Sequence, residues 1–172
     1  MRLWWFPAAM VLAGASLAAT SPVTLREVCD SIASVGARVT LQHLYKNKDQ
    51  WVGLLAGIAT GEPGWLNTAK QLRAVSDAGA TEQIDLAAGE ALEHRPADVL
   101  SLIVDDFGIT HVCGGADVDD ARFDSYESSM AAIQRREEML RAVQEDTLRQ
   151  KRDACLAELD RAKADVARFY GH

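Results

Sequence analysis

The sequence predicts an all-α protein: a compact bundle of about six or seven short helices in antiparallel hairpins, followed by two longer charged helices. Alanine makes up 28 of the 172 residues and favours helix, because it loses no side-chain entropy on entering one. Apolar residues recur three and four positions apart, the spacing of a helix that buries one face. Short connections rich in Gly, Pro, Ser and Asp separate these stretches and are typical of turns.

The first residues have the features of a secretory signal peptide. Arg2 supplies a positive charge, residues 3–17 carry no charge, and small residues follow at Ser16 and Ala18, the positions that a signal peptidase reads. We expect cleavage after Ala18 or Ala19. The uncharged run is shorter than the roughly 20 residues of a membrane-spanning helix, so retention as an anchor is the less favoured alternative.

Removal of residues 1–18 would leave one helical domain, residues 19–172, and would take the net charge from −7 to −8 with the loss of one Arg. The charge is unevenly distributed within this domain. Residues 19–116 carry 7 basic and 12 acidic side chains, whereas the shorter segment 117–172 carries 10 and 13. We therefore expect a sparsely charged helical core followed by a charged helical pair.

Three helices are expected before residue 60. The first has an apolar stripe made of Leu25, Val28, Cys29 and Ile32. Residues 37–45 fit a helix, although the β-branched pair at 39–40 also fits a strand, and we favour helix. The third is expected to have Asp49 as its N-cap and an apolar stripe made of Trp51, Leu54, Leu55 and Ile58. It must end between residues 57 and 64, where Gly and Pro break helices.

The next stretch predicts three more short helices. One has the stripe Trp65, Ala69, Leu72 and Val75, and residues 76–80 then form a turn. Thr81 is expected to cap a helix whose buried face comprises Ile84, Ala87, Ala88, Ala91 and Leu92. Pro96 suits the first turn of a further helix over 97–104, in which the inward residues are Val99, Leu100 and Ile103.

The charged C-terminal segment predicts two helices, about 124–145 and 147–170. Their apolar positions are three, four or seven residues apart with one five-residue step, and comprise Met130, Ile133, Leu140, Val143, Leu148, Cys155, Leu159, Ala162, Val166 and Phe169. Asp146 lies at that step and is expected to cap the second helix. Two ion pairs in the favourable order are expected on the outer faces, Glu137 with Arg141 and Glu145 with Arg149.

Three cysteines allow one intramolecular disulfide in an oxidising compartment and leave one thiol over. We favour Cys113 with Cys155, because Cys113 lies in a Gly-rich loop that can adjust to reach a Cys on the last helix. Cys29 is then expected to be a buried, inert thiol on the stripe of its helix. A disulfide that includes Cys29 is the alternative.

No sequence motif for nucleophilic catalysis, zinc binding or phosphate binding occurs, and we assign no catalytic residue, no metal ligand and no cofactor. The one suggestive segment is 105–124, which contains Asp105, Asp106, His111, Cys113, Asp117, Asp119, Asp120 and Asp124. As a calcium loop, it has Arg122 where the sharp turn requires Gly and Ser128 where the bidentate Glu belongs. We therefore favour a solvated acidic loop over a metal site or a hydrolase centre.

Trp51 and Trp65 are the candidate partner-contact residues, because each opens a short helix and large aromatic rings are favoured interface anchors. Packing in the core is the stronger interpretation, since both lie on apolar stripes. A net charge of −7 argues against nucleic acid as a partner, because phosphate recognition needs a basic face. No membrane partner is expected for the mature chain.

A family resemblance rests on seven segments: 51–55, 58–61, 64–66, 90–92, 96–100, 112–113 and 152–156. Together they resemble a group of small uncharacterised exported proteins of proteobacteria, over most of the mature chain. The resemblance implies a helical periplasmic domain and a Cys113–Cys155 bridge, and it implies no activity. The general form, a signal peptide with acidic helices and one disulfide, is also similar to periplasmic immunity proteins.

These observations predict an exported periplasmic protein that binds another protein as an inhibitor, immunity or accessory protein and has no catalytic activity. We expect the acidic C-terminal helices to form the contact surface, against a basic partner such as a secreted toxin or a lysozyme-like enzyme. The alternative is a small periplasmic hydrolase or metal-dependent protein built around residues 105–124.

Overall fold

The structure is a computed structural model that describes residues 23–114 and 125–171, and all regular secondary structure in these ranges is helical. This confirms the predicted all-α fold. The α-helices are α1 (Leu25–Val35), α2 (Ala37–Lys46), α3 (Lys48–Ala59), α4 (Pro63–Arg73), α5 (Ala78–Glu90), α6 (Pro96–Leu102), α7 (Val104–Phe107), α8 (Ile109–Cys113), α9 (Tyr126–Ala142) and α10 (Arg149–Tyr170). Two 3₁₀ turns, η1 (Ala91–Glu93) and η3 (Asp146–Leu148), precede α6 and α10.

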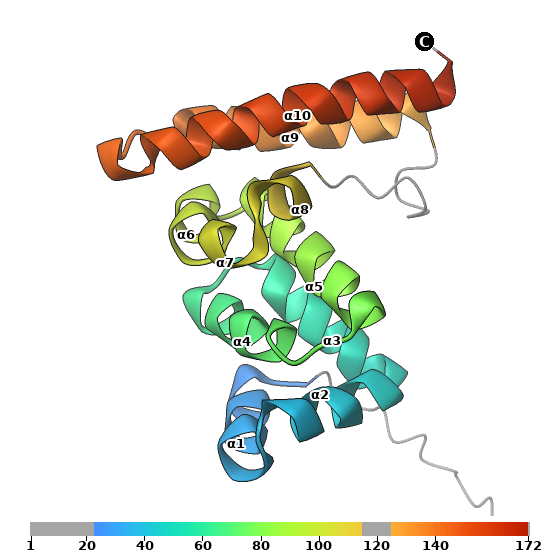
Figure 1. Cartoon of the computed structure of the whole chain (residues 1–172), viewed down its shortest axis with the longest axis vertical. Helices are drawn as coiled ribbons and strands as arrows, with labels where there is room; N and C mark the ends of the chain where they lie inside the picture. Colours follow the sequence, from blue (N-terminus) through green and yellow to red (C-terminus); the bar gives the residue numbers. More distant parts are fainter. Residues whose placement is uncertain (1–22, 115–124, 172) are drawn as a thin grey trace, which may run out of the picture.

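The short helices follow one another up the molecule, and the two long ones lie across one end of it. Figure 1 shows α1 and α2 at the opposite end, α3, α4 and α5 in the middle, and α8 between α5 and the α9–α10 hairpin. Helix α10 packs against α9 and α8, and α9 packs against η1. The hairpin therefore contacts the bundle mainly through the segment that runs from α5 to α8.

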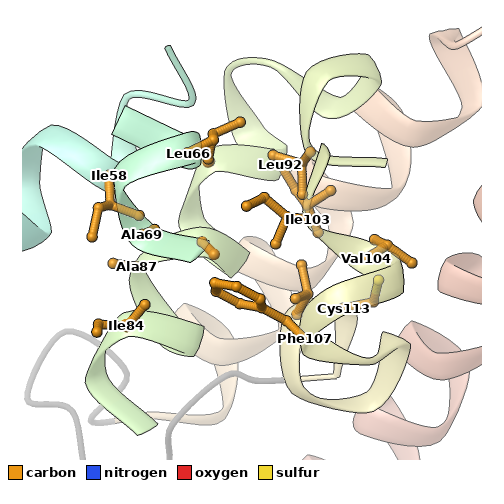
Figure 2. Packing of buried hydrophobic residues seen from close by; sticks show 14 of the residues in the cluster. Ile58, Leu66, Ala69, Ile84, Ala87, Leu92, Ile103, Val104, Phe107 and Cys113 are labelled. Atoms are coloured by element: carbon orange, nitrogen blue, oxygen red, sulfur yellow. The ribbon is translucent and has the colours of Figure 1, made fainter. Parts of the chain in front are cut away.

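One continuous hydrophobic core extends from α1 to α10. Figure 2 shows part of this core, with Ile58 of α3, Leu66 of α4, Leu92 and Ile103, all fully buried. The inward residues predicted for α6 and the α5 stripe are buried as expected, including Val99, Leu100, Ile103, Ile84 and Ala88. Residues 37–45, for which a strand was the alternative, lie in α2.

Two glycines allow neighbouring helices to approach closely. A Cβ atom on Gly57 of α3 would lie 2.5 Å from the ring of Trp65, so the indole of α4 packs directly on the α3 backbone. A Cβ atom on Gly89 of α5 would lie 2.7 Å from the carbonyl oxygen of Val112, which brings α8 against α5. A larger residue at either glycine would therefore require the neighbouring helix to shift.

The helix boundaries correct two predicted caps. Asn47, rather than Asp49, caps α3, since its side chain accepts a hydrogen bond from the amide of Gln50 at 3.3 Å. Asp77, rather than Thr81, caps α5 and accepts from the amide of Ala80 at 3.0 Å. In both cases the helix begins earlier than the apolar stripe, because a short polar side chain upstream satisfies the first amides.

The C-terminal pair forms as predicted, with α9 ending three residues before the expected 145. Asp146 makes no capping hydrogen bond there; it lies in η3 and pairs with Arg149, in place of the predicted pair of Glu145 with Arg149. The other predicted pair is present, with Arg141 Nη2 3.6 Å from Glu137 Oε1. The expected start at residue 124 lies outside the described residues.

A buried arginine attaches α9 to the bundle. The side chain of Arg136 is only 1% exposed, and its Nε lies 3.4 Å from Oε1 of Glu93 in η1. Burial lowers the pKa of Arg136, against the opposing effects of the Glu93 and Glu90 carboxylates. Arg135 reaches the other oxygen of Glu93 at 3.0 Å. The acidic pair on the α5–η1 segment thus supplies the counter-charge for an arginine in the core.

Candidate functional site

The disulfide predicted from the sequence joins α8 to α10. The Sγ atoms of Cys113 and Cys155 lie at bonding distance, their Cα atoms are 5.3 Å apart, and both residues are fully buried. This Cα separation is within the ordinary range for disulfides. Cys113 is the last residue of α8 rather than part of a flexible Gly-rich loop, so a helix rather than an adaptable loop presents it to α10.

Cys29 differs from its prediction as a buried thiol. It is exposed on α1, where its Sγ lies 3.7 Å from Oγ1 of Thr68 in α4. Helix α1 lies at the edge of the bundle and Val28 is its one fully buried residue, so the helix is too peripheral to bury the whole stripe. The apolar stripe identified the side of α1 that faces the bundle, but it did not show how much of that side the other helices bury.

The two candidate partner-contact tryptophans are buried. Trp51 is 6% exposed, donates a 2.6 Å hydrogen bond from Nε1 to Oε1 of Gln83, and meets the edge of Tyr45. Trp65 is 8% exposed and packs on Gly57. Packing within the chain accounts for both side chains, and a partner contact at either remains a prediction that rests on the sequence.

The described part of segment 105–124 does not converge on one centre. Asp105 pairs with Lys151 and Asp106 with Lys70, each at 2.7 Å, on separate parts of the surface. Among the residues that the structure describes, no three His, Cys, Asp or Glu side chains are grouped to hold a metal ion. The remaining aspartates of the segment, Asp117, Asp119, Asp120 and Asp124, lie outside the described residues.

Three helices instead enclose a cleft of about 520 Å³, within the usual size range of ligand sites. Helices α5, α8 and α10 form its walls, and the disulfide joins two of these walls. The lining residues are Ala78, Thr81, Glu82, Asp85, Leu86, Thr110, His111, Gly114, Glu158, Ala162 and Asp165.

Asp85 is the most firmly held of the cleft carboxylates. It is 4% exposed, and Arg73 of α4 binds it with two nitrogens, Nε at 2.5 Å from Oδ1 and Nη2 at 2.9 Å from Oδ2. The hydrogen bond from Arg73 to Asp85 raises the pKa of the guanidinium. Arg73 also lies over the ring of Phe107, 4.5 Å from its centroid. The exposed imidazole of His111 faces the same carboxylate, with Nδ1 3.9 Å from Oδ2.

The cleft is acidic along both of its long walls. Glu82 and Asp85 come from α5, Glu158 and Asp165 come from α10, and no Lys or Arg of the described residues belongs to the lining. Glu158 is 8% exposed and its carboxylate lies close against Gly114, where a Cβ atom would be 3.1 Å from Oε1. Its partner Arg161 and the partner of Asp165, Arg168, are exposed outside the cleft.

No protein-family model, curated protein sequence or solved structure matches this chain. The arrangement of side chains is therefore the basis for any functional assignment. Carboxylates, two threonine hydroxyls and one imidazole can bind a cationic group by charge and hydrogen bonds. The sulfur of Cys113, the nucleophile of the alternative hydrolase hypothesis, is bonded to Cys155.

The cleft was not predicted from the sequence, although part of its pattern is present there. Glu82 and Asp85 are three residues apart, and Glu158 and Asp165 are seven apart, so each pair lies on one face of its helix. The spacing does not show that α5 and α10 lie on opposite sides of α8 and so bring the two pairs of carboxylates into one cleft.

In the ranges that the structure describes, no helix is long and apolar enough to cross a membrane.

Proposed function

We propose that this protein is exported and acts by binding another protein, of basic character, without a catalytic reaction of its own. The observation that supports this proposal is the acidic cleft between α5, α8 and α10, which has carboxylates on two walls and, among the residues that the structure describes, no Lys or Arg in its lining. A cationic side chain of a partner would interact with Glu82 and with carboxylates that already pair with Arg73, Arg161 and Arg168, between walls that the disulfide and the Arg73–Asp85 pair hold in place. Such preorganisation reduces the cost of binding.

The charge distribution favours this cleft over the outer surface of the C-terminal helices, where the sequence analysis placed the contact. Residues 125–171 contain nine basic and nine acidic side chains, so the α9–α10 hairpin has no net charge. Residues 23–114 contain 7 basic and 12 acidic side chains, and the four aspartates of 117–124 account for the acidic excess of the C-terminal segment. Charge complementarity to a basic partner is thus strongest on the α5 side of the cleft.

Affinity capture with matched charge variants tests this proposal. The purified protein is immobilised and exposed to periplasmic extract at low salt and at about 0.15 M salt, where charges beyond roughly 8 Å are screened. We expect a basic protein that is captured more strongly at low salt, and we expect Glu82→Lys to abolish its capture. Glu138→Lys makes the same charge change at an exposed position on α9 and should leave capture intact.

The comparison of the two variants decides the outcome. Capture that Glu82→Lys and Glu138→Lys reduce equally would show a general charge effect and contradict a site in the cleft. Loss with Glu138→Lys alone would place the contact on the hairpin. Capture that does not depend on salt would contradict a basic partner.

Export has its own test. We expect the protein isolated from the periplasmic fraction of its own bacterium to begin at Ala19 or Thr20, because cleavage follows Ala18 or Ala19. Mass spectrometry of the intact protein and sequencing of its N-terminal peptide measure this directly. Recovery of a chain that begins at Met1 in the cytoplasmic fraction would contradict export, whatever the result of the capture experiment.

A further inference from the structure

Phe169 is an exposed aromatic residue at an unexpected position. It belongs to the apolar series predicted for the last helix, yet it is 64% exposed, the highest value among the large hydrophobic residues that the structure describes. The adjacent ring of Tyr170 meets it edge-on at 5.0 Å between centroids, and Tyr170 in turn contacts Tyr126 of α9. Phe169 is thus held at one edge and presents the rest of its ring to solvent.

The position of Phe169 on α10 connects it to the cleft. Glu158, Ala162 and Asp165 line the cleft, and Phe169 follows Asp165 by four residues, so the four side chains lie on one helical face. Leu159 and Val166 lie on the neighbouring face and are buried in the core. The α10 wall of the cleft therefore continues beyond the Asp165 carboxylate for about one helical turn, about 6 Å along the helix axis, to the exposed ring of Phe169.

We propose that Phe169 is the apolar anchor of the binding surface, so that the partner presents a cationic side chain to the cleft and an apolar group about one helical turn away, over the Phe169 ring. The inference rests on the proposed function and names the chemistry of its partner: a basic segment with apolar residues beside its arginines or lysines. Aromatic side chains, Phe among them, are enriched in protein–protein interfaces. A second copy of this chain is the less favourable partner, because each copy without residues 1–18 would have a net charge of −8 and the two would repel each other.

A set of three synthetic peptides of equal length serves as the probe. The first is an amphipathic helix with arginines and leucines, the second has its leucines replaced by serine, and the third has its arginines replaced by glutamate. Binding of each peptide to the purified protein is measured by fluorescence anisotropy. We expect the arginine–leucine peptide to bind best, the arginine–serine peptide to bind more weakly, and the glutamate peptide not to bind.

Phe169→Ala is then compared with Val52→Ala, which removes an exposed apolar side chain, 56% exposed, from α3 outside the cleft lining. We expect Phe169→Ala to weaken binding of the arginine–leucine peptide about tenfold and binding of the arginine–serine peptide less than twofold. Phe169→Leu should retain most of the affinity of the parent protein. Val52→Ala should change the binding of neither peptide. Because Phe169 is exposed, the unfolding temperature of the Phe169→Ala variant should remain that of the parent.

Two results would overturn the inference in different ways. Equal effects of Phe169→Ala and Val52→Ala, with binding of both arginine peptides still sensitive to Glu82→Lys, would remove Phe169 from the surface and leave the cleft as a cationic site. Failure of every arginine peptide to bind, or equal binding of the glutamate peptide, would contradict the proposed function as well.

Discussion

Replacing Cys113 and Cys155 together by alanine is expected to lower the free energy of unfolding by about 4 kcal/mol. The disulfide closes a loop with a sequence separation of 42, and in the chain-entropy account a loop of this length restricts the unfolded chain by that amount. Since domains are commonly stable by only about 5–15 kcal/mol, this is a large fraction of the total. Urea unfolding monitored by circular dichroism measures the loss.

Cys29→Ala is the matched control, because it removes an exposed thiol. We expect it to change the free energy of unfolding by less than about 0.5 kcal/mol, as surface substitutions usually do. Thiol titration of the parent protein in denaturant should find one free thiol. Three free thiols, or a stability of the double variant equal to that of the parent, would contradict the disulfide.

Replacing Glu90 and Glu93 together by glutamine is expected to cost about 3 kcal/mol of stability. Arg136 is 1% exposed, and these two carboxylates are the acidic groups that favour its charged form. The substitutions keep the shape of both side chains but leave a buried guanidinium without counter-charge, which is strongly destabilising. Chemical unfolding at neutral pH measures the effect, and no change in the slope of the transition is expected.

Arg136→Met in the same background separates charge from packing. A buried ion pair can often be replaced by apolar side chains at little cost, so the triple variant should recover most of the stability lost by the double variant. If the double variant is as stable as the parent, Arg136 does not depend on these carboxylates. If Arg136→Met destabilises the double variant further, the arginine acts through contacts other than charge.

The helical core was predictable because the residues on the buried face of a helix recur every three or four positions in the sequence. Ile84, Ala88, Val99, Leu100 and Ile103 are buried as their spacing indicates. Caps were less predictable, since several short polar residues precede each helix and the local hydrogen bond decides among them. Asn47 and Asp77 lie two and four residues before the caps expected for their helices.

The candidate site depends on contacts between different helices, which the spacing of apolar residues within one helix does not indicate. Arg73 and Asp85 are 12 residues apart, on different helices, and nothing in their local sequence indicates a pair. Phe169 follows the apolar spacing of Val166 and Leu159, yet it lies at the end of α10 and is 64% exposed, so no described helix covers its ring. Apolar spacing therefore identified the inward side of most helices, but not which helices would lie opposite that side.

The place of Cys29 in the fold limits which of the three cysteines can pair within one molecule. In an unfolded chain all three pairings are possible. In the folded chain α1 lies at the end of the molecule opposite the α9–α10 hairpin, far from the buried Cys113–Cys155 pair (Figure 1). Helix packing thus selects the native bridge by separation in space, and Cys29 is left as the one thiol whose oxidation partner must come from another molecule.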